Sequence, residues 1–293
     1  MTVSEGSGEG SFYWAVQQAN LNTGADEIVF SSALNGTAIK PGADAAVVIT
    51  DDVTITGNGI GETILGDESS GFLIFEVGAD TEVTVRDLTI RYGRGLKGGT
   101  ADVYYEHGGA IVNAGTLNLE KVRFENNSST GNGGAVYSTG DLDMTEVSFD
   151  DADTNAVYVD GGALTIENSL FNGSSLGLNT AENSFVAGTT FYGSSSAAVD
   201  HSGTGSLTII NSTIANGGIT SSGNVMLVNT IATCELGGNG KYTLYSSVYG
   251  SAAGSATVSA DNASALKTYA DVFGSNVLAD NGGYVWSLKT EAM

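Results

Sequence analysis

Aromatic and polar side chains recur at one fixed spacing along the middle of this chain. Tyr137 and Tyr158 stand 21 residues apart, Asn179 and Asp200 follow at the same interval, and His201 is next to Asp200. Two rings in one outward column would let sugar rings stack on them, and the polar groups beside them would bind hydroxyls. We therefore predict a ligand-binding column of Tyr137, Tyr158, Asn179 and Asp200. Alternatively, the tyrosines stack on each other and only cover a strand face.

A cluster of aspartates is the second candidate site. Six fall within twenty residues: Asp141, Asp143, Asp150, Asp151, Asp153 and Asp160. Neighbouring carboxylates raise the pKa of at least one of them, which suits a general acid in glycoside hydrolysis, while others activate water. The candidates for such catalysis are Asp143, Asp150, Asp200 and His201.

The same cluster has two other interpretations. Asp150, Asp151 and Asp153 supply the carboxylate oxygens that Ca²⁺ prefers, so calcium is the one cofactor considered, and none is required. The chain has no run of GGxGxDxUx nonapeptides, which would make calcium binding convincing. A solvated acidic turn is the remaining interpretation.

Basic residues gather in one stretch and form the third candidate. They are Arg86, Arg91, Arg94, Lys97 and His107. Such groups could neutralise a uronate in a polysaccharide lyase, but Glu120 and Glu125 occupy equivalent places one repeat later and suggest ion pairs instead. Nucleophile-elbow, P-loop and HExxH motifs are missing from the sequence, and no Ser or Cys pattern near His201 suggests a catalytic triad.

A repeat along the chain must position all of these residues. Its pattern of alternating apolar positions ends in Phe or Ile at residues 90, 124, 149, 171, 191 and 214, in steps of 34, 25, 22, 20 and 23. A second apolar column follows with matching steps: Ile111, Val136, Val157, Leu178, Val199 and Ile219. Alternation with a period of two indicates strands, and steps of this size fit one turn of a β-solenoid.

Like residues would stack on like in such a solenoid, about 4.8 Å apart. The pattern predicts an inner aromatic stack at Phe124, Phe149, Phe171 and Phe191. It also predicts an asparagine ladder at a turn, formed by Asn168, Asn211 and Asn229. The glycine pairs at 108–109, 133–134 and 161–162 stand where each rung must turn.

The expected architecture is all-β, a right-handed parallel β-helix of roughly ten rungs with a short N-terminal capping helix. Ser11 would cap this helix, whose buried face would carry Phe12, Ala15, Val16 and Ala19. We expect one domain over residues 1–293, with the cap and first strand in 1–35 and rungs in 36–250. Residues 251–293 would form irregular rungs or a cap, truncated from a longer protein.

Composition restricts the possible partners. The chain carries 33 acidic and 10 basic residues, a formal charge of −23, which argues against binding nucleic acid. No apolar run reaches the roughly 20 residues of a membrane-spanning helix, so membrane insertion is not expected. Cys234 is the single cysteine and is expected to be a buried rung residue. The first residues show no signal peptide, so an export signal was removed or the chain is a module of a longer protein.

Several short motifs resemble a known family. GGAI at 108–111, GGAV at 133–136 and FENN at 124–127 are similar to the paired GGA[ILV] and FxxN repeats of polymorphic outer-membrane proteins and related autotransporter passengers. The opening GSFYWAVQQAN at 10–20 resembles the start of secreted bacterial β-helix proteins, and NVLADNGGYVWSL at 276–288 resembles a stretch near their end. Tyr284 stands where that stretch usually has proline. The resemblance implies a right-handed β-helix, export, and adhesion or display, and it carries no catalytic site.

The leading functional hypothesis is a non-catalytic extracellular or bacterial cell-surface module, acting in adhesion, display or surface assembly. Its partner would be a polysaccharide or another cell-surface ligand. The alternative is a carbohydrate-active β-helix, either a polysaccharide lyase, a glycoside hydrolase or a sugar-binding module, using an outward groove on successive rungs. Self-association into a fibre or layer is the third hypothesis. Fold class does not decide between them.

Overall fold

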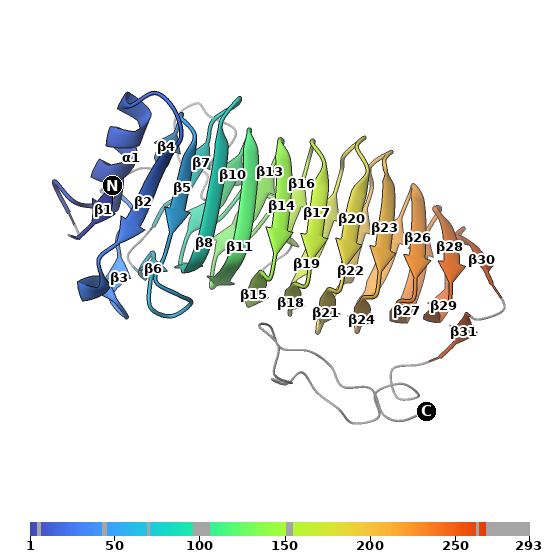
Figure 1. Cartoon of the computed structure of the whole chain (residues 1–293). Helices are drawn as coiled ribbons and strands as arrows, with labels where there is room; N and C mark the ends of the chain where they lie inside the picture. Colours follow the sequence, from blue (N-terminus) through green and yellow to red (C-terminus); the bar gives the residue numbers. More distant parts are fainter. Residues whose placement is uncertain are drawn as a thin grey trace. The chain divides into compact units, whose positions relative to one another are not determined.

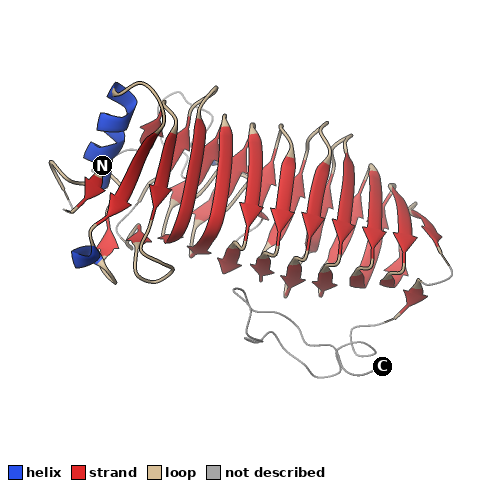
Figure 2. Ribbon diagram, viewed as in Figure 1, coloured by secondary structure: helices blue, strands red, loops and turns tan. Residues whose placement is uncertain are grey.

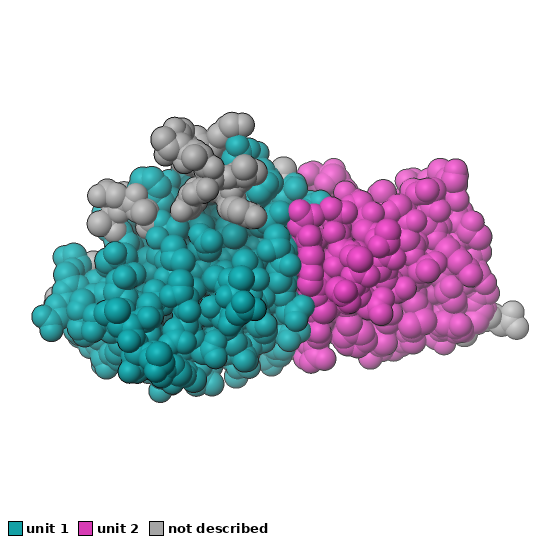
Figure 3. Space-filling view, turned by 90° about the horizontal axis from the view of Figure 1, so that it is seen from above, with its two compact units in different colours: residues 1–158 teal, residues 159–293 magenta. Residues whose placement is uncertain are grey.

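The computed structural model describes residues 1–4, 7–42, 46–68, 71–95, 106–150, 155–261 and 264–267. The chain forms two compact units, Met1–Tyr158 and Val159–Met293 (Figure 3). The secondary structure of both units is mainly short parallel strands (Figures 1 and 2). The predicted all-β parallel solenoid with an N-terminal helix is confirmed, whereas its handedness and the single domain over 1–293 stay predictions.

The strands of Met1–Tyr158 fall into three parallel stacks. The first contains β1 (Thr2–Val3), β2 (Asp26–Phe30), β5 (Val53–Thr56), and the first halves of β8 (Glu82–Arg91) and β11 (Thr116–Glu125), then β14 (Asp141–Thr145). The second contains β3 (Ala38–Ile39), β6 (Ile64–Leu65), the second halves of β8 and β11, and β15 (Ser148–Asp150). The third contains β4 (Val47–Ile49), β7 (Phe75–Val77), β10 (Ile111–Asn113) and β13 (Val136–Ser138). β9 (Arg94–Gly95) and β12 (Ser128–Ser129) form a separate pair, and β16 (Asn155–Val159) includes the unit boundary.

Val159–Met293 repeats the three-stack arrangement. The first stack contains β17 (Leu164–Glu167), β20 (Ser184–Ala187), β23 (Ser206–Ile210), β26 (Asn224–Val228), β28 (Lys241–Tyr245) and β30 (Thr257–Ala260). The second contains β18 (Leu170–Asn172), β21 (Thr190–Tyr192), β24 (Thr213–Ala215), β27 (Ile231–Gly238), β29 (Val248–Ala252) and β31 (Ala265–Leu266). The third contains β19 (Ser175–Leu178), β22 (Ala197–His201), β25 (Gly218–Ser221) and the last part of β27.

Alternating apolar residues point into the solenoid, as the repeat predicted. Leu117 pairs in register with Val83 before it and Leu142 after it, and all three side chains are fully buried. In the predicted aromatic stack, Phe124 lies on Phe149 with ring centroids 5.0 Å apart. Phe171 lies on Phe191 at 4.6 Å. Stacked, near-parallel rings bury large apolar areas without leaving voids between rungs.

The second predicted column is confirmed at two pairs of rungs and wrong at another. Ile111 pairs with Val136, and Val199 pairs with Ile219, as expected. However, Leu176 rather than Leu178 is the partner of Val199, and both leucines are fully buried. A slip of two residues keeps every side chain on the same face of a strand, so alternation alone could not detect it.

The predicted asparagine ladder is formed in part, by left-handed turn residues of Val159–Met293. Asn168, Asn211 and Asn229 all have positive φ, a conformation that asparagine tolerates better than most residues. The Asn229 side-chain amide nitrogen donates to the Asn211 side-chain oxygen, Oδ1, at 2.7 Å. Gly188 takes the ladder position between Asn168 and Asn211, and a Cβ there would lie 2.4 Å from the Asn168 side-chain oxygen. The ladder is therefore interrupted at that rung.

The N-terminal helix is α1 (Phe12–Leu21), and a 3-10 turn, η1, spans Ser32–Leu34. The Ser11 side chain caps α1 by accepting from the Trp14 amide at 3.2 Å, and the four predicted side chains are buried. Among the residues that the structure describes, no helix is long and apolar enough to span a membrane. The predicted terminal motif at 276–288 lies outside the described residues.

We expect Phe149→Ala to lower the free energy of unfolding by about 3–5 kcal/mol, because it leaves a cavity beside Phe124. Asp143→Ala, an exposed outward position on the same rung, should change it by less than about 0.5 kcal/mol. Urea denaturation followed by circular dichroism measures both. Similar effects of the two substitutions would contradict the assigned register.

Candidate functional site

The two predicted platform tyrosines do stack, but they do not form an open surface. Their rings lie 6.1 Å apart and almost parallel, at 5°. The His107 imidazole, on the rung before, stacks on Tyr137 at 4.5 Å, and only 6% of Tyr137 remains exposed. For Tyr137, the alternative interpretation holds: its ring is stacked and covers a strand face. Tyr158 is half-buried.

Asn179 and Asp200 do not share an outward position. Asp200 pairs in register with Gly177, while Asn179 follows the end of β19 and donates to Asp160 at 2.6 Å. The expected column of Asn179 above Asp200 is therefore wrong, for the same two-residue slip that displaced Leu178. Asp200 itself is exposed on β22.

His201 points into the solenoid and is 1% exposed. Its Nδ1 lies 3.0 Å from the Ser221 hydroxyl. Burial lowers the pKa of His201, and hydrogen bonding to the Gly205 backbone and the charge of Asp200 oppose this only in part. A neutral, buried imidazole beside a serine forms part of the core, and solvent does not reach it as it would reach a general acid or base.

The described aspartates of the acidic cluster lie on two strands and a turn: Asp141 and Asp143 on β14, Asp150 on β15, and Asp160 just after β16. Asp143 is exposed on β14, whereas Asp150 lies on β15 and binds Arg123 through contacts of 3.1 and 3.0 Å. Asp151 and Asp153, two of the three candidate calcium ligands, lie outside the described residues. Within the described ranges, no group of three or more His, Cys, Asp or Glu residues could hold a metal ion.

The basic stretch has its own partners. Arg86 and Arg91 pair in register with Glu120 and Glu125, as predicted. Nevertheless, the Arg86 guanidinium reaches toward earlier rungs, with its Nε donating to Thr56 at 3.0 Å and an amino group 3.8 Å from Glu27. Glu125 instead binds Arg123 at 2.8 Å. Lys97 lies outside the described residues.

Cys234 is buried, as expected, and burial raises the pKa of its thiol to about 12. Its neighbour Tyr242 places a phenol inside the core, where the side chain is fully buried. The Tyr242 hydroxyl lies 2.9 Å from the Ile219 carbonyl and 2.8 Å from the Gly237 carbonyl, in contact with both acceptors. Burial also raises the pKa of this phenol. A protonated thiol and a protonated phenol serve packing here.

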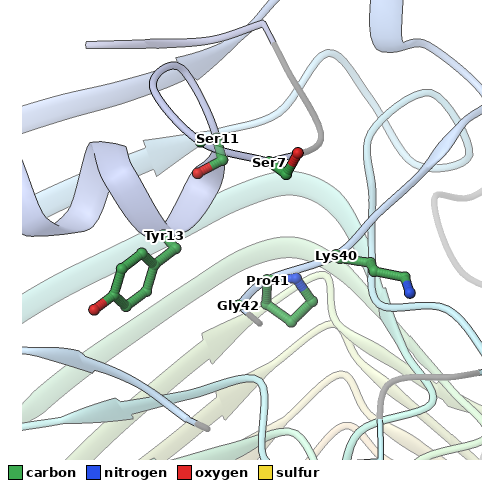
Figure 4. Close-up of a pocket in the computed structure, with 7 residues that line it drawn as sticks. Ser7, Ser11, Tyr13, Lys40, Pro41 and Gly42 are labelled. Carbon is green, nitrogen blue, oxygen red and sulfur yellow. The ribbon is translucent and has the colours of Figure 1, made fainter. Parts of the chain in front are cut away.

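Two shallow hollows were not predicted from the sequence. One, of about 310 Å³, is lined by Ser7, Gly8, Ser11, Tyr13, Lys40, Pro41 and Gly42 (Figure 4). Its lysine pairs with Asp67 at 3.8 Å. The other, of about 400 Å³, is lined by Gly203, Thr204, Ser222, Gly223, Asn224, Asn239 and Lys241. The residues of the second hollow come from successive turns, so only the 17-residue step from Asn224 to Lys241 could have indicated it.

The motif residues of the FENN segment have structural roles. Phe124 belongs to the inner stack, and Asn127 is buried at the turn that follows. The Asn127 side-chain oxygen accepts from the Gly93 amide at 2.9 Å, and its nitrogen donates to the Ile90 carbonyl at 3.1 Å. One side chain thus satisfies two backbone groups of the preceding rung. Gly133, in the following GGAV segment, has a φ of 69° that glycine adopts without strain.

Residues 121–139 match the family model of the Chlamydia polymorphic membrane protein repeat. The match spans both FENN and GGAV, and the chain is therefore a parallel β-solenoid that carries a repeat of this type. No curated protein and no solved structure matches the chain significantly.

We expect Asn127→Ala to lower the free energy of unfolding by about 1–3 kcal/mol, since the Gly93 amide and Ile90 carbonyl would be left buried and unpaired. Asn118→Ala is the matched control, because the Asn118 amide binds Glu82 at the surface, at 3.3 Å. Its cost should be at most about 0.5 kcal/mol. Equal losses in chemical denaturation would contradict the bridging role of Asn127.

His201 should make the stability of the chain fall in mild acid. In the unfolded chain this imidazole binds a proton below its ordinary pKa of 6.5. In the folded chain its pKa is lower, so it binds the proton only at a lower pH. Stability from this residue is thus complete above pH 6.5 and is lost as the pH falls toward the folded-state pKa, by at most about 1.4 kcal/mol per pH unit. Urea unfolding between pH 7.5 and 5.5 should show this slope, and His201→Gln should reduce it. An unchanged slope in the variant would exclude His201 as its source.

Proposed function

We propose that this chain is a non-catalytic module displayed outside the cell or on a bacterial cell surface, where it acts in adhesion, display or surface assembly. The observation that carries the proposal is the match of residues 121–139 to a repeat named for polymorphic membrane proteins. Within this segment Phe124, Asn127 and Gly133 hold rungs together, so the repeat specifies a scaffold.

The surroundings of the candidate catalytic residues agree with a binding role. His201 is buried, Asp150 is neutralised by Arg123, and Asp143 lies on a different strand from Asp150. Acid–base catalysis on a sugar requires two groups that reach one glycosidic bond from solvent. The outward side chains instead vary from rung to rung on a regular scaffold, which is the arrangement that a recognition surface needs.

Adhesion can be measured with the chain displayed on a non-adherent bacterium that is then applied to cultured epithelial cells and to immobilised glycans. We expect more bound bacteria than with an empty display vector. Running the assay with calcium and with a chelator tests whether the acidic rungs take part, and equal binding in both would assign adhesion to other residues. Adhesion no greater than that of the empty vector on every surface would contradict the proposal.

A further inference from the structure

The hollow in Val159–Met293 is formed by three successive turns of the solenoid. Thr204, Ser222 and Asn239 come from these turns, and Asn224 and Lys241 begin the strands β26 and β28. Two of its lining residues are glycines, Gly203 and Gly223, and neither position has room for a larger side chain. A Cβ at Gly203 would lie 2.2 Å from the Thr180 carbonyl oxygen, and one at Gly223 would lie 2.8 Å from the His201 ring. The hollow has a volume of about 400 Å³.

Polar side chains around this hollow are not engaged by the protein. Within the part of the chain that the structure describes, the side chains of Thr204, Asn224, Asn239 and Lys241 make no hydrogen bond or ion pair. By contrast, Asn118 binds Glu82 on a neighbouring rung. One hydroxyl, two amides and one ammonium group are therefore free to bind a ligand at the same place.

The charge of this group is unusual for the chain. Residues 159–293 hold three of the ten basic residues, and Lys241 is the one that lines the hollow. An ammonium group favours a carboxylate, and amides and hydroxyls favour a ligand with many hydroxyls. A single lysine in a protein of charge −23 suits a ligand with one negative charge better than a polyanion.

An apolar surface adjoins the hollow on the same two strands. Met226 is 36% exposed and Tyr245 is 47% exposed, and both lie outward on β26 and β28. Val228, also outward, pairs in register with Tyr245. At about 3.3 Å per residue, Tyr245 lies roughly 13 Å along the strand from Lys241, within reach of a short oligosaccharide. Exposed apolar and aromatic groups pack against the C–H faces of sugar rings.

We infer that this hollow binds a sugar that carries one carboxylate, with Lys241 on the carboxylate, Asn224, Asn239 and Thr204 on hydroxyls, and further rings over Met226 and Tyr245. The inference rests on the proposed adhesive role, for which it names a ligand class and a site.

The test uses the whole chain and two probes that differ only in the carboxylate, methyl glucuronoside and methyl glucoside. Titration by calorimetry, with saturation-transfer NMR to locate contacts, should give millimolar binding of the glucuronoside and at least about tenfold weaker binding of the glucoside. Acetate at the same concentration should compete poorly, because it offers no hydroxyls. Equal affinity for both sugars, equal competition by acetate, or no binding of the glucuronoside would overturn the inference.

Substitutions then locate the site. Lys241→Met should weaken glucuronoside binding at least about tenfold, and Lys241→Arg should restore most of it. Lys267→Met is the control, since it removes the same charge from another exposed lysine of this unit. An affinity that Lys241→Met leaves unchanged would contradict the assignment, provided that its thermal unfolding matches that of the parent chain. The two proposals can fail separately. If the parent chain does not bind the glucuronoside and the displayed Lys241→Met variant still adheres to cells, this site is rejected and the adhesive role stands.

Discussion

Parallel pairing of each strand with the strand one rung later, in register, determines the rest of both units. Because the pairing repeats every rung, each side chain meets its equivalent about 4.8 Å away. An apolar position then becomes a buried column, and a phenylalanine becomes a stack, as at Phe124 and Phe149. The same constraint makes a buried polar group destabilising unless a neighbour hydrogen-bonds to it. The Asn127 side chain makes such hydrogen bonds to two backbone groups of the preceding rung.

The constraint also divides the residues that chemistry could use from those that hold the fold. Three titratable side chains that could take part in catalysis lie inside the solenoid: His201, Cys234 and Tyr242. Burial there keeps the thiol and the phenol protonated and the imidazole neutral. Charged groups remain outside, where several pair across rungs, as Arg123 does with Asp150. Outward positions that the fold does not need are therefore the ones open to recognition, and Lys241 lies at such a position.

The fold could be predicted from the sequence because its main signal is periodic. Apolar columns, glycine pairs at turns and the Ser11 cap each follow from local rules, and their positions agree with the structure. The candidate site could not be predicted in the same way. Its column depended on register at β19, where Leu176 and Leu178 fit the inward pattern equally well. Burial of Tyr137 depended on His107, a residue whose stacking partner lies 30 positions away.

The central claim, that the module binds without catalysing, is tested most directly by a product assay. The whole chain is incubated with a panel of acidic and neutral polysaccharides, and new reducing ends and unsaturated uronides are measured over time. Our account predicts no product from any polysaccharide, including those that bind. Product that accumulates with time and disappears on a single substitution, such as Asp200→Asn, would contradict it.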